Sequence, residues 1–301
     1  MNFNTRIDSI HLPELESTGV SLFIKRDDLI DGQVSGNKLY KLRLNIEQAK
    51  REGKDTILTF GGAYSNHIAA TAKYCKEQGL NSIGIIRGER AEKLNPTLRL
   101  AEQNGMQLEF INRSNYRLKS DPEHLRQVSS RFNEPYVIPE GGANLLGIEG
   151  SKDILNDNCA QYDFIVSAMG TGTTFAGLVR GAKPNQKVIG IPIHKHEELI
   201  RDIINVDPTF EEISNERFKV LGGYHFGGYA KWTNELLAFI RAFHRNTSIK
   251  LDPIYTGKAM FACIDLIKTG HFSKGSKMLF IHTGGLQAIP GFEERFELRL
   301  F

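Results

Sequence analysis

The sequence predicts an α/β fold with two open, twisted, mostly parallel sheets, each flanked by helices. Short runs rich in β-branched and aromatic residues alternate with helical patterns along the chain. Such alternation is typical of parallel strands joined by crossover helices. Glycines cluster where the expected strands end, and open α/β sheets bind their ligands there. The length of 301 residues suggests two domains of ~150 residues each.

The β-branched and aromatic runs define the expected strands. They are Thr56–Phe60, Ser82–Ile86, Gln107–Ile111, Tyr136–Ile138, Phe164–Ala168, Lys187–Ile191 and Lys277–His282. Helices are expected between them, most ending near glycine or a basic residue. They are a helix beginning near Lys38 and the segments Ser65–Gln78, Thr173–Gly181, Lys231–His244 and Lys258–Lys268. We expect the amphipathic C-terminal segment 292–301 to dock on the body of the protein or on a second subunit.

Composition narrows the class of protein. With 40% hydrophobic and 24% charged residues, the chain can bury a large core. Its 38 basic and 35 acidic residues give a net charge of only +3, and it lacks the basic stripe with interleaved aromatics that nucleic-acid binding needs. No apolar run approaches the ~18 residues of a membrane span, and the N-terminus does not resemble a secretory signal. We expect a cytoplasmic protein without nucleic-acid or membrane partners.

Cysteine and histidine spacing gives no metal or disulfide signal. Cys75, Cys159 and Cys263 are odd in number, far apart and without a Cys-x-x-Cys, which argues against a disulfide framework and a zinc knuckle. Buried thiols are expected instead. His194 and His196 would share a strand face, but no third ligand has recognisable spacing. No metal site is predicted.

Two lysines at an expected helix start are the first candidates for chemistry. Lys38 follows the glycine-containing turn Ser35-Gly36-Asn37, and Lys41 lies three residues further on, so both amines project from one side of a helix. The positive end of a helix dipole disfavours a cation but suits a phosphate. One lysine can form a Schiff base with a carbonyl cofactor while the other pairs with its phosphate. The alternative for these residues alone is a solvated first turn.

A glycine and threonine loop follows the expected strand Phe164–Ala168. The run Gly170-Thr171-Gly172-Thr173-Thr174 then enters an apolar helix. Glycines let backbone N–H groups turn toward an anion, and the helix start adds its field. A Walker loop would need Gly-Lys before Ser or Thr, and a dinucleotide fingerprint would need Gly at Phe175. The loop therefore suits a single phosphate monoester, the alternative being a plain turn.

A second loop, Gly61-Gly62-Ala63-Tyr64-Ser65-Asn66-His67, also joins a strand to a helix. Ser65 is a good N-cap residue. A carboxylate could dock at this helix start. The alternative is a capping serine without a ligand.

Six motifs occur in the order found in one enzyme family. They are Ser35-Gly36-Asn37-Lys38 with Lys41, Ser65-Asn66-His67, Gly141-Gly142-Ala143-Asn144, Gly170-Thr171-Gly172-Thr173-Thr174, Asp252-Pro253-Ile254-Tyr255-Thr256-Gly257-Lys258 and His282-Thr283-Gly284-Gly285. The chain resembles the D-cysteine desulfhydrase and 1-aminocyclopropane-1-carboxylate (ACC) deaminase family over nearly its whole length. Those are fold-type II pyridoxal 5'-phosphate (PLP) enzymes, similar to the β subunit of tryptophan synthase.

The resemblance implies a domain organisation. A large PLP-binding domain would comprise residues 1–44 and 149–301, and a small domain residues 45–148. The active site would lie in the cleft between them. The resemblance also implies a homodimer.

The resemblance also implies roles for individual residues. Lys38 would hold PLP as a Schiff base, Lys41 and the loop Gly170–Thr174 would hold the phosphate, Asn66 would contact the ring hydroxyl, and Thr256 would face the pyridine nitrogen. The implied catalytic residues are Lys38, Tyr255, Ser65 and Tyr229, and the implied substrate-binding residues are Ser65, Asn66, His67 and Thr283.

The substrate inferred from the resemblance is a small amino acid. The ACC deaminases tend to carry glutamate and leucine where this chain has Thr256 and Thr283, whereas the D-cysteine enzymes carry threonine at both positions. This favours β-elimination from D-cysteine to pyruvate, sulfide and ammonia, with Lys38 taking the α-proton. ACC deamination to 2-oxobutyrate and non-catalytic PLP binding are the alternatives. Ala143 and the segment Gly227–Trp232 depart from the family pattern, so substrate identity stays open.

Overall fold

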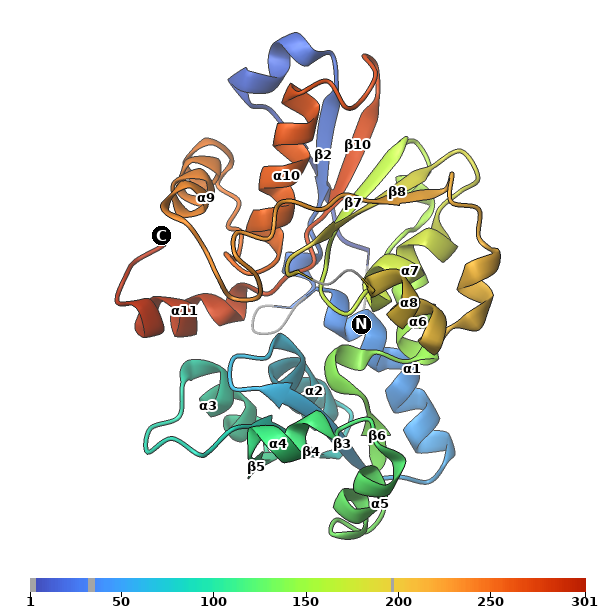
Figure 1. The fold of residues 1–301 in the computed structure, drawn as a ribbon, viewed down its shortest axis with the longest axis vertical. Coiled ribbons are helices and arrows are strands. Elements are labelled where there is room, and N and C mark those ends of the chain that lie inside the picture. The colour runs from blue at the N-terminus through green and yellow to red at the C-terminus, as the bar shows by residue number, and fades with distance from the viewer. Residues whose placement is uncertain (1–3, 32–35, 196–197) are drawn as a thin grey trace.

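Two sheets, each with helices packed on it, make up the chain (Figure 1). The computed structural model describes residues 4–31, 36–195 and 198–301. Ser35 of the first lysine motif and His196 of the histidine pair lie outside these ranges. The α/β class with mostly parallel sheets is confirmed, because only the first two strands pair antiparallel.

The larger sheet has the strand order β1-β2-β10-β7-β8-β9. Its strands are β1 (Ile7–Ile10), β2 (Ser21–Lys25), β7 (Phe164–Met169), β8 (Lys187–Pro192), β9 (Phe218–Val220) and β10 (Lys277–Ile281). β7 lies between β10 and β8, with Val166 paired to both Phe280 and Ile189. The loops that follow β7, β8 and β10 therefore leave the same edge of the sheet.

The smaller sheet is parallel throughout and has the order β5-β4-β3-β6. Its strands are β3 (Thr56–Gly62), β4 (Asn81–Arg87), β5 (Met106–Ile111) and β6 (Tyr136–Ile138). β3 and β4 are each buried over five consecutive residues, as expected where helices cover both faces of a sheet. All four strands fall within residues 45–148. The domain boundaries themselves stay a prediction, and the first helix, α1, runs across the one at residue 45.

Helices join the strands and cover both sheets (Figure 1). They are α1 (Asn37–Arg51), α2 (Asn66–Glu77), α3 (Pro96–Gln103), α4 (Arg113–Arg117), α5 (Pro122–Ser130), α6 (Leu145–Lys152), α7 (Thr173–Gly181), α8 (Leu199–Val206), α9 (Asn234–Thr247), α10 (Thr256–Lys268) and α11 (Ile289–Phe296). Within the described ranges, no helix is long and apolar enough to cross a membrane.

Some elements differ from the sequence-based expectation. β1, β2 and β9 were not expected, since they are only three to five residues long and give a weak periodic signal. α9 begins at Asn234 rather than Lys231, because the Thr233 hydroxyl accepts a hydrogen bond from the Leu236 N–H and caps the helix. The three cysteines are free and buried, as expected.

The C-terminal segment docks on the body of the chain, one of the two expected arrangements. The ring of Phe292 in α11 packs edge-on against Trp232 at a centroid distance of 6.0 Å, and α11 also contacts α3 of the smaller half. Aromatic contacts of this kind add to the free energy gained by burial. α11 thus connects the two halves on the side where their loops face each other (Figure 1).

Candidate active site

A cavity of about 940 Å³ collects most of the predicted site residues. Loops from both sheets line it, which places it between the two halves of the molecule. The predicted residues on its wall are Lys38, Lys41, Ser65, Asn66, His67, Gly170, Thr171, Gly172, Thr174, Tyr229, Tyr255 and Thr283. Thr173 and Thr256 are buried and do not line it.

Lys38 lies in the first turn of α1 and faces this cavity. Its Nζ donates to Asn37 Oδ1 at 3.1 Å. Burial lowers the pKa of Lys38 to about 8, although the charge of Asp252 opposes the shift. A larger fraction of this amine is therefore neutral, and hence nucleophilic, at physiological pH than for an exposed lysine.

The lowered pKa gives a direct prediction for the cofactor-free protein. The rate at which an added aldehyde such as PLP reacts with Lys38 should rise with pH and reach half its maximum near pH 8, because only the neutral amine attacks. For an exposed lysine, with a pKa of about 10.4, the rate would still be rising at pH 8. Stopped-flow absorbance measures the rate. The kinetic phase that is missing in the Lys38→Ala protein is the reaction of Lys38. A midpoint near that of an exposed lysine would contradict the assigned environment.

The backbone at Gly36 fixes where α1 begins. Gly36 has a φ of +89° and forms an isolated antiparallel bridge with Gly284, while the Asn37 N–H donates to Thr283 O at 3.2 Å. A Cβ atom at Gly36 would lie 2.0 Å from Thr283 O. Only glycine fits here, and its contact holds Lys38 beside the loop after β10.

Gly36→Ala should therefore destabilise the fold by about 2 kcal/mol or more, since it combines a positive φ with a backbone clash. A ligand should also bind less tightly at Lys38, because α1 must shift away from Thr283. Gly222→Ala is the matched control, as a Cβ at Gly222 meets no atom within 4 Å. Thermal unfolding compares the two variants. Equal midpoints would show that the contact at Gly36 is dispensable.

The loop after β7 forms an anion-binding cradle. Gly172 adopts φ +79° and precedes α7, whose first N–H groups have no partner within the helix. Gly172 and Thr174 line the cavity. The hydroxyls of Thr171 and Thr173 lie 3.0 Å apart, and Thr174 Oγ1 accepts from Asn37 Nδ2 at 2.7 Å. That last bond joins the cradle directly to the helix that carries Lys38.

Lys41 lies deeper in the wall than Lys38. It is 2% exposed, and its Nζ donates to Gly141 O at 3.1 Å. Burial, and then the neighbouring charge of Lys38, lower the pKa of Lys41 well below its ordinary value. A bound anion would offset both effects.

Asn66 and His67 begin α2, which Ser65 caps by accepting from the Ile68 N–H at 3.3 Å. Asn66 Oδ1 is buried without a partner among the described residues, and so is His67 Nδ1. Thr59 Oγ1 donates its hydrogen to Ile138 O, so His67 Nε2 must donate to Thr59 at 2.9 Å. Burial and then the charges of Lys38 and Lys41 lower the pKa of His67 well below its usual value. His67 is thus neutral, with an unprotonated Nδ1.

Two tyrosines also line the cavity. The Tyr255 hydroxyl donates to the Tyr229 hydroxyl at 3.5 Å, and their rings meet edge-on at 6.2 Å. Burial raises the pKa of Tyr255 well above its ordinary value. This phenol therefore keeps its proton at physiological pH and can donate it.

Asp252 holds Tyr255 in place. Its buried carboxylate accepts from the N–H groups of Ile254, Tyr255 and Thr256 at 2.8–2.9 Å, and from the Thr256 hydroxyl at 2.6 Å. Negative charge at the start of a helix is also favourable. The Thr256 hydroxyl accepts in turn from the Asp252 N–H at 2.9 Å. The structure therefore places Thr256 behind the cavity wall, bonded to Asp252.

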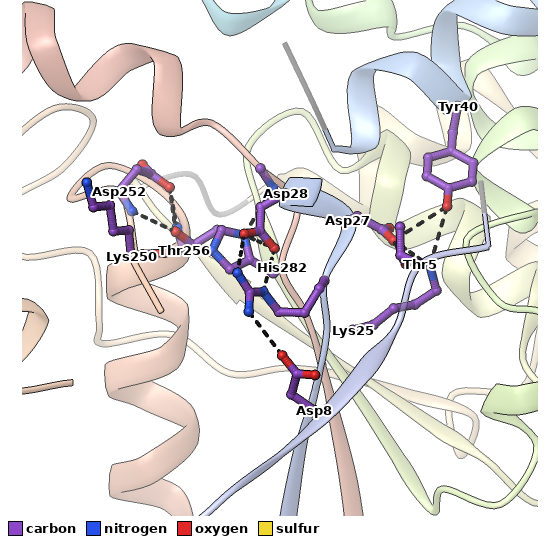
Figure 2. A network of polar contacts seen from close by, with 12 residues as sticks. Thr5, Asp8, Lys25, Asp27, Asp28, Tyr40, Lys250, Asp252, Thr256 and His282 are labelled. Carbon is purple, nitrogen blue, oxygen red and sulfur yellow. Dashed lines mark hydrogen bonds and ion pairs between the residues drawn. The ribbon is translucent and has the colours of Figure 1, made fainter. Parts of the chain in front are cut away.

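A buried polar network supports the loop after β10 (Figure 2). Arg26 pairs with Asp28 at 2.7 Å and Asp8 at 3.0 Å, and Asp28 Oδ1 lies 3.8 Å from His282 Nδ1. His282 Nδ1 accepts from the Gly284 N–H, so its Nε2–H donates to Lys250 O at 2.7 Å. These bonds fix the strand end that presents Thr283 to the cavity.

Comparison with known proteins identifies the family. A family model described as pyridoxal-phosphate dependent enzyme matches residues 2–284. The chain belongs to this family. Its cofactor is PLP, and it is an enzyme of the ACC deaminase-like group.

The relatives cover almost the whole chain. A Pyrococcus abyssi protein named "Putative 1-aminocyclopropane-1-carboxylate deaminase" is 33% identical over 96% of this chain and 92% of its own length. The Pyrococcus horikoshii protein of the same name is 32% identical over 92% and 88%. A crystal structure titled as an ACC deaminase homologue has a TM-score of 0.85 at 31% identity, covering 98% of this chain and 94% of that one. A hydrogen sulfide-producing enzyme from Fusobacterium nucleatum, 17% identical with a TM-score of 0.68 and 93% coverage of both chains, shares the fold.

The residues that line the cavity fit PLP independently of the comparisons. The cradle at the start of α7 supplies hydroxyl and N–H donors for a phosphate, and Asn66 Oδ1 is a buried acceptor that still lacks a donor. Lys38 offers a partly neutral amine in the same cavity. We propose that these groups hold the phosphate, the ring hydroxyl and the aldehyde carbon, respectively.

Sequence reasoning missed several residues of this site. Asn37 joins the cradle to α1, and Asp252 organises Tyr255, although both lay inside quoted motifs. Arg87, at the end of β4, lines the cavity with its guanidinium 5.7 Å from the Tyr116 ring and has no carboxylate partner in the described chain. Nothing in its local pattern distinguishes it from a solvated strand end.

Proposed function

We propose that this PLP enzyme eliminates the β-thiol of D-cysteine to give pyruvate, ammonia and sulfide. The observation that carries the proposal is the placement of a base and an acid around one cavity: the Lys38 amine on α1 and the neutral Tyr255 phenol at the start of α10. β-Elimination needs both, because a proton must leave the α-carbon while the departing thiolate gains one.

When bound, PLP withdraws electrons from the α-carbon of an attached amino acid. The Lys38 amine, once free, accepts the α-proton, and its lowered pKa suits a base that works near neutral pH. The Tyr255 hydroxyl, with Tyr229 as its hydrogen-bond partner, delivers a proton to the β-thiolate as the C–S bond breaks. Addition of water to the remaining three-carbon fragment yields pyruvate and ammonia.

The start of α2 serves as the carboxylate site. Ser65, Asn66 and His67 line the cavity where the N–H groups of this helix are not yet bonded within it. A substrate carboxylate there would satisfy those donors. Docking the carboxylate at α2 would leave the α-carbon between Lys38 and the tyrosines.

Thr283 supports a thiol substrate over ACC. Its side chain lines the cavity, and the D-cysteine enzymes that the chain resembles carry threonine here rather than leucine. Thr256 matches them as well, although it acts from behind the wall through Asp252.

ACC deamination is the second candidate, favoured by the names of the Pyrococcus relatives. Steady-state assays of the purified holoenzyme with D-cysteine, L-cysteine, D-serine and ACC distinguish the two. We expect sulfide and pyruvate from D-cysteine at the highest kcat/KM. Preferential release of 2-oxobutyrate from ACC would reverse the assignment. PLP binding without turnover of any of them would indicate a non-catalytic binder. The homodimer implied by the resemblance and the cytoplasmic location expected from the composition belong to the same proposal. Light scattering measures the oligomeric state.

A further inference from the structure

Lys258 is a fully buried cation that the proposed reaction does not use. It lies at the third position of α10 and is 0% exposed. Its Nζ donates to Gly228 O at 2.8 Å, His225 O at 2.9 Å and Ile193 O at 3.2 Å. An ammonium has three hydrogens, so these carbonyls match its full donor capacity.

The three acceptors come from separate parts of the chain. Ile193 follows β8, whereas His225 and Gly228 belong to residues 221–231 between β9 and α9, which we call the Tyr229 loop. Tyr229 follows Gly228 directly, and Tyr255 precedes Lys258 by one helical turn. Lys258 therefore joins the helix that carries one tyrosine to the loop that carries the other.

The other side-chain anchors of the Tyr229 loop precede Gly227: the Tyr224 hydroxyl donates to Asp265 at 2.6 Å, and the Phe226 ring packs edge-on against Phe261 at 5.1 Å. Phe226 and Ala230 adopt positive φ angles of 51° and 54°, and Gly228 one of 124°. Strained backbone of this kind persists only where its surroundings enforce it. The Tyr229 side chain is 47% exposed, so side-chain packing alone does not fix it.

A buried lysine at this position is costly. Removing an ammonium from water is unfavourable, and the positive end of the α10 dipole adds to the penalty. Burial lowers the pKa of Lys258 to about 8, with the charge of Asp252 opposing the shift. The group thus stays mainly protonated at neutral pH and keeps all three donors. A residue needed only to fill space would be apolar.

We propose that Lys258 is a positioning residue that fastens the Tyr229 loop to α10 and β8, and thereby holds Tyr229 beside Tyr255 over the cavity. The catalytic part of this inference rests on the proposed function, whereas the fastening of the loop does not. Lys258 acts through the backbone, since its ammonium contacts carbonyl groups of the loop.

Hydrogen exchange of the holoenzyme tests the fastening itself. In Lys258→Met the amides of Gly227, Gly228 and Lys231, which are bonded within the loop, should exchange at least about tenfold faster, because local opening no longer breaks charge-assisted bonds. The middle of α10 and both sheets should be unchanged. Lys231→Met is the matched control, since it removes an exposed lysine of the same loop whose ammonium makes no hydrogen bond or ion pair with the described residues.

The single tryptophan gives a second readout. Trp232 follows the loop and packs against Phe296 at 5.4 Å, so its emission should shift to the red in Lys258→Met but not in Lys231→Met. Should Lys258→Met not fold, Lys258→Gln keeps two donors and should still speed exchange in the loop. Unchanged loop exchange, or equal acceleration throughout α10 and the sheets, would show that Lys258 only supports the core.

A double-mutant cycle tests the link to catalysis. Lys258→Met should lower kcat/KM for D-cysteine by about tenfold in the wild-type background. In a Tyr229→Phe background the same change should cost less than about twofold, because both act through one hydroxyl. Additive losses would overturn the positioning role. If the holoenzyme does not turn over D-cysteine at all, the proposed function fails, while the exchange experiment still decides whether Lys258 holds the loop.

Discussion

Lys38→Ala is expected to lower turnover of D-cysteine by about 10²- to 10⁴-fold, the range for loss of a positioned general base. We expect no substitute for this amine, because the Lys41 amine is bonded to Gly141 O. The variant should also lose the yellow colour on dialysis, since PLP is then held only by the cradle and Asn66. Steady-state sulfide release and absorbance measure the two effects.

Borohydride reduction followed by peptide mapping identifies the modified lysine in the unaltered enzyme. We expect the label on Lys38. Lys50→Ala provides the control, because Lys50 lies at the far end of the same helix and its amine donates to Gln78 at the surface. Label on another lysine, or full activity in Lys38→Ala, would remove the basis of the proposed function.

Asp252→Ala is expected to destabilise the fold by about 3–5 kcal/mol, the largest stability effect we foresee. The carboxylate is fully buried and accepts hydrogen bonds from three backbone N–H groups and the Thr256 hydroxyl. Each buried donor left without a partner costs about 1–3 kcal/mol, less where water can enter. Denaturant unfolding with an unchanged m-value measures the loss.

Asp157→Ala is the control for this change. Asp157 is fully exposed and lies 3.8 Å from Lys183, so the unfolding midpoint should stay close to that of the unaltered protein. Asp252→Ala should also reduce activity at temperatures where the protein is folded, because Tyr255 loses its backbone anchor. A variant as stable as Asp157→Ala would mean that the carboxylate does not organise the start of α10.

Local signals in the sequence were sufficient for much of the fold. β6 and α7 have the predicted bounds, and β3, β4, β5, β7, β8 and β10 differ from prediction by one or two residues at an end. β3, β4, β7, β8 and β10 each contain four or five consecutive buried residues, which is typical of strands covered on both faces. β9 has three residues and β1 four. Segments so short are defined by the neighbours they pair with, which no local pattern reveals.

The candidate site was also predictable only in part. Some site residues stand out because their residue types and turns are unusual where they occur: Lys38, the cradle at Gly170–Thr174 and Tyr255. The structure brings them to one cavity. Thr256 illustrates the limit, since its motif marks it as a cofactor contact while the fold turns its hydroxyl to Asp252. That Thr256 faces the pyridine nitrogen stays a prediction.

Neighbouring residues were enough to predict the α/β class, the parallel strands and the residue types that can bind PLP, because periodicity, glycine turns and helix starts are local properties. Which of these groups meet depends on the folded chain. Asn37 and Thr174 are 137 residues apart and share a hydrogen bond, and Lys258 bonds to carbonyls 65 and 30 residues away. Such contacts depend on the order of strands in the sheet, which arises from packing of the whole chain.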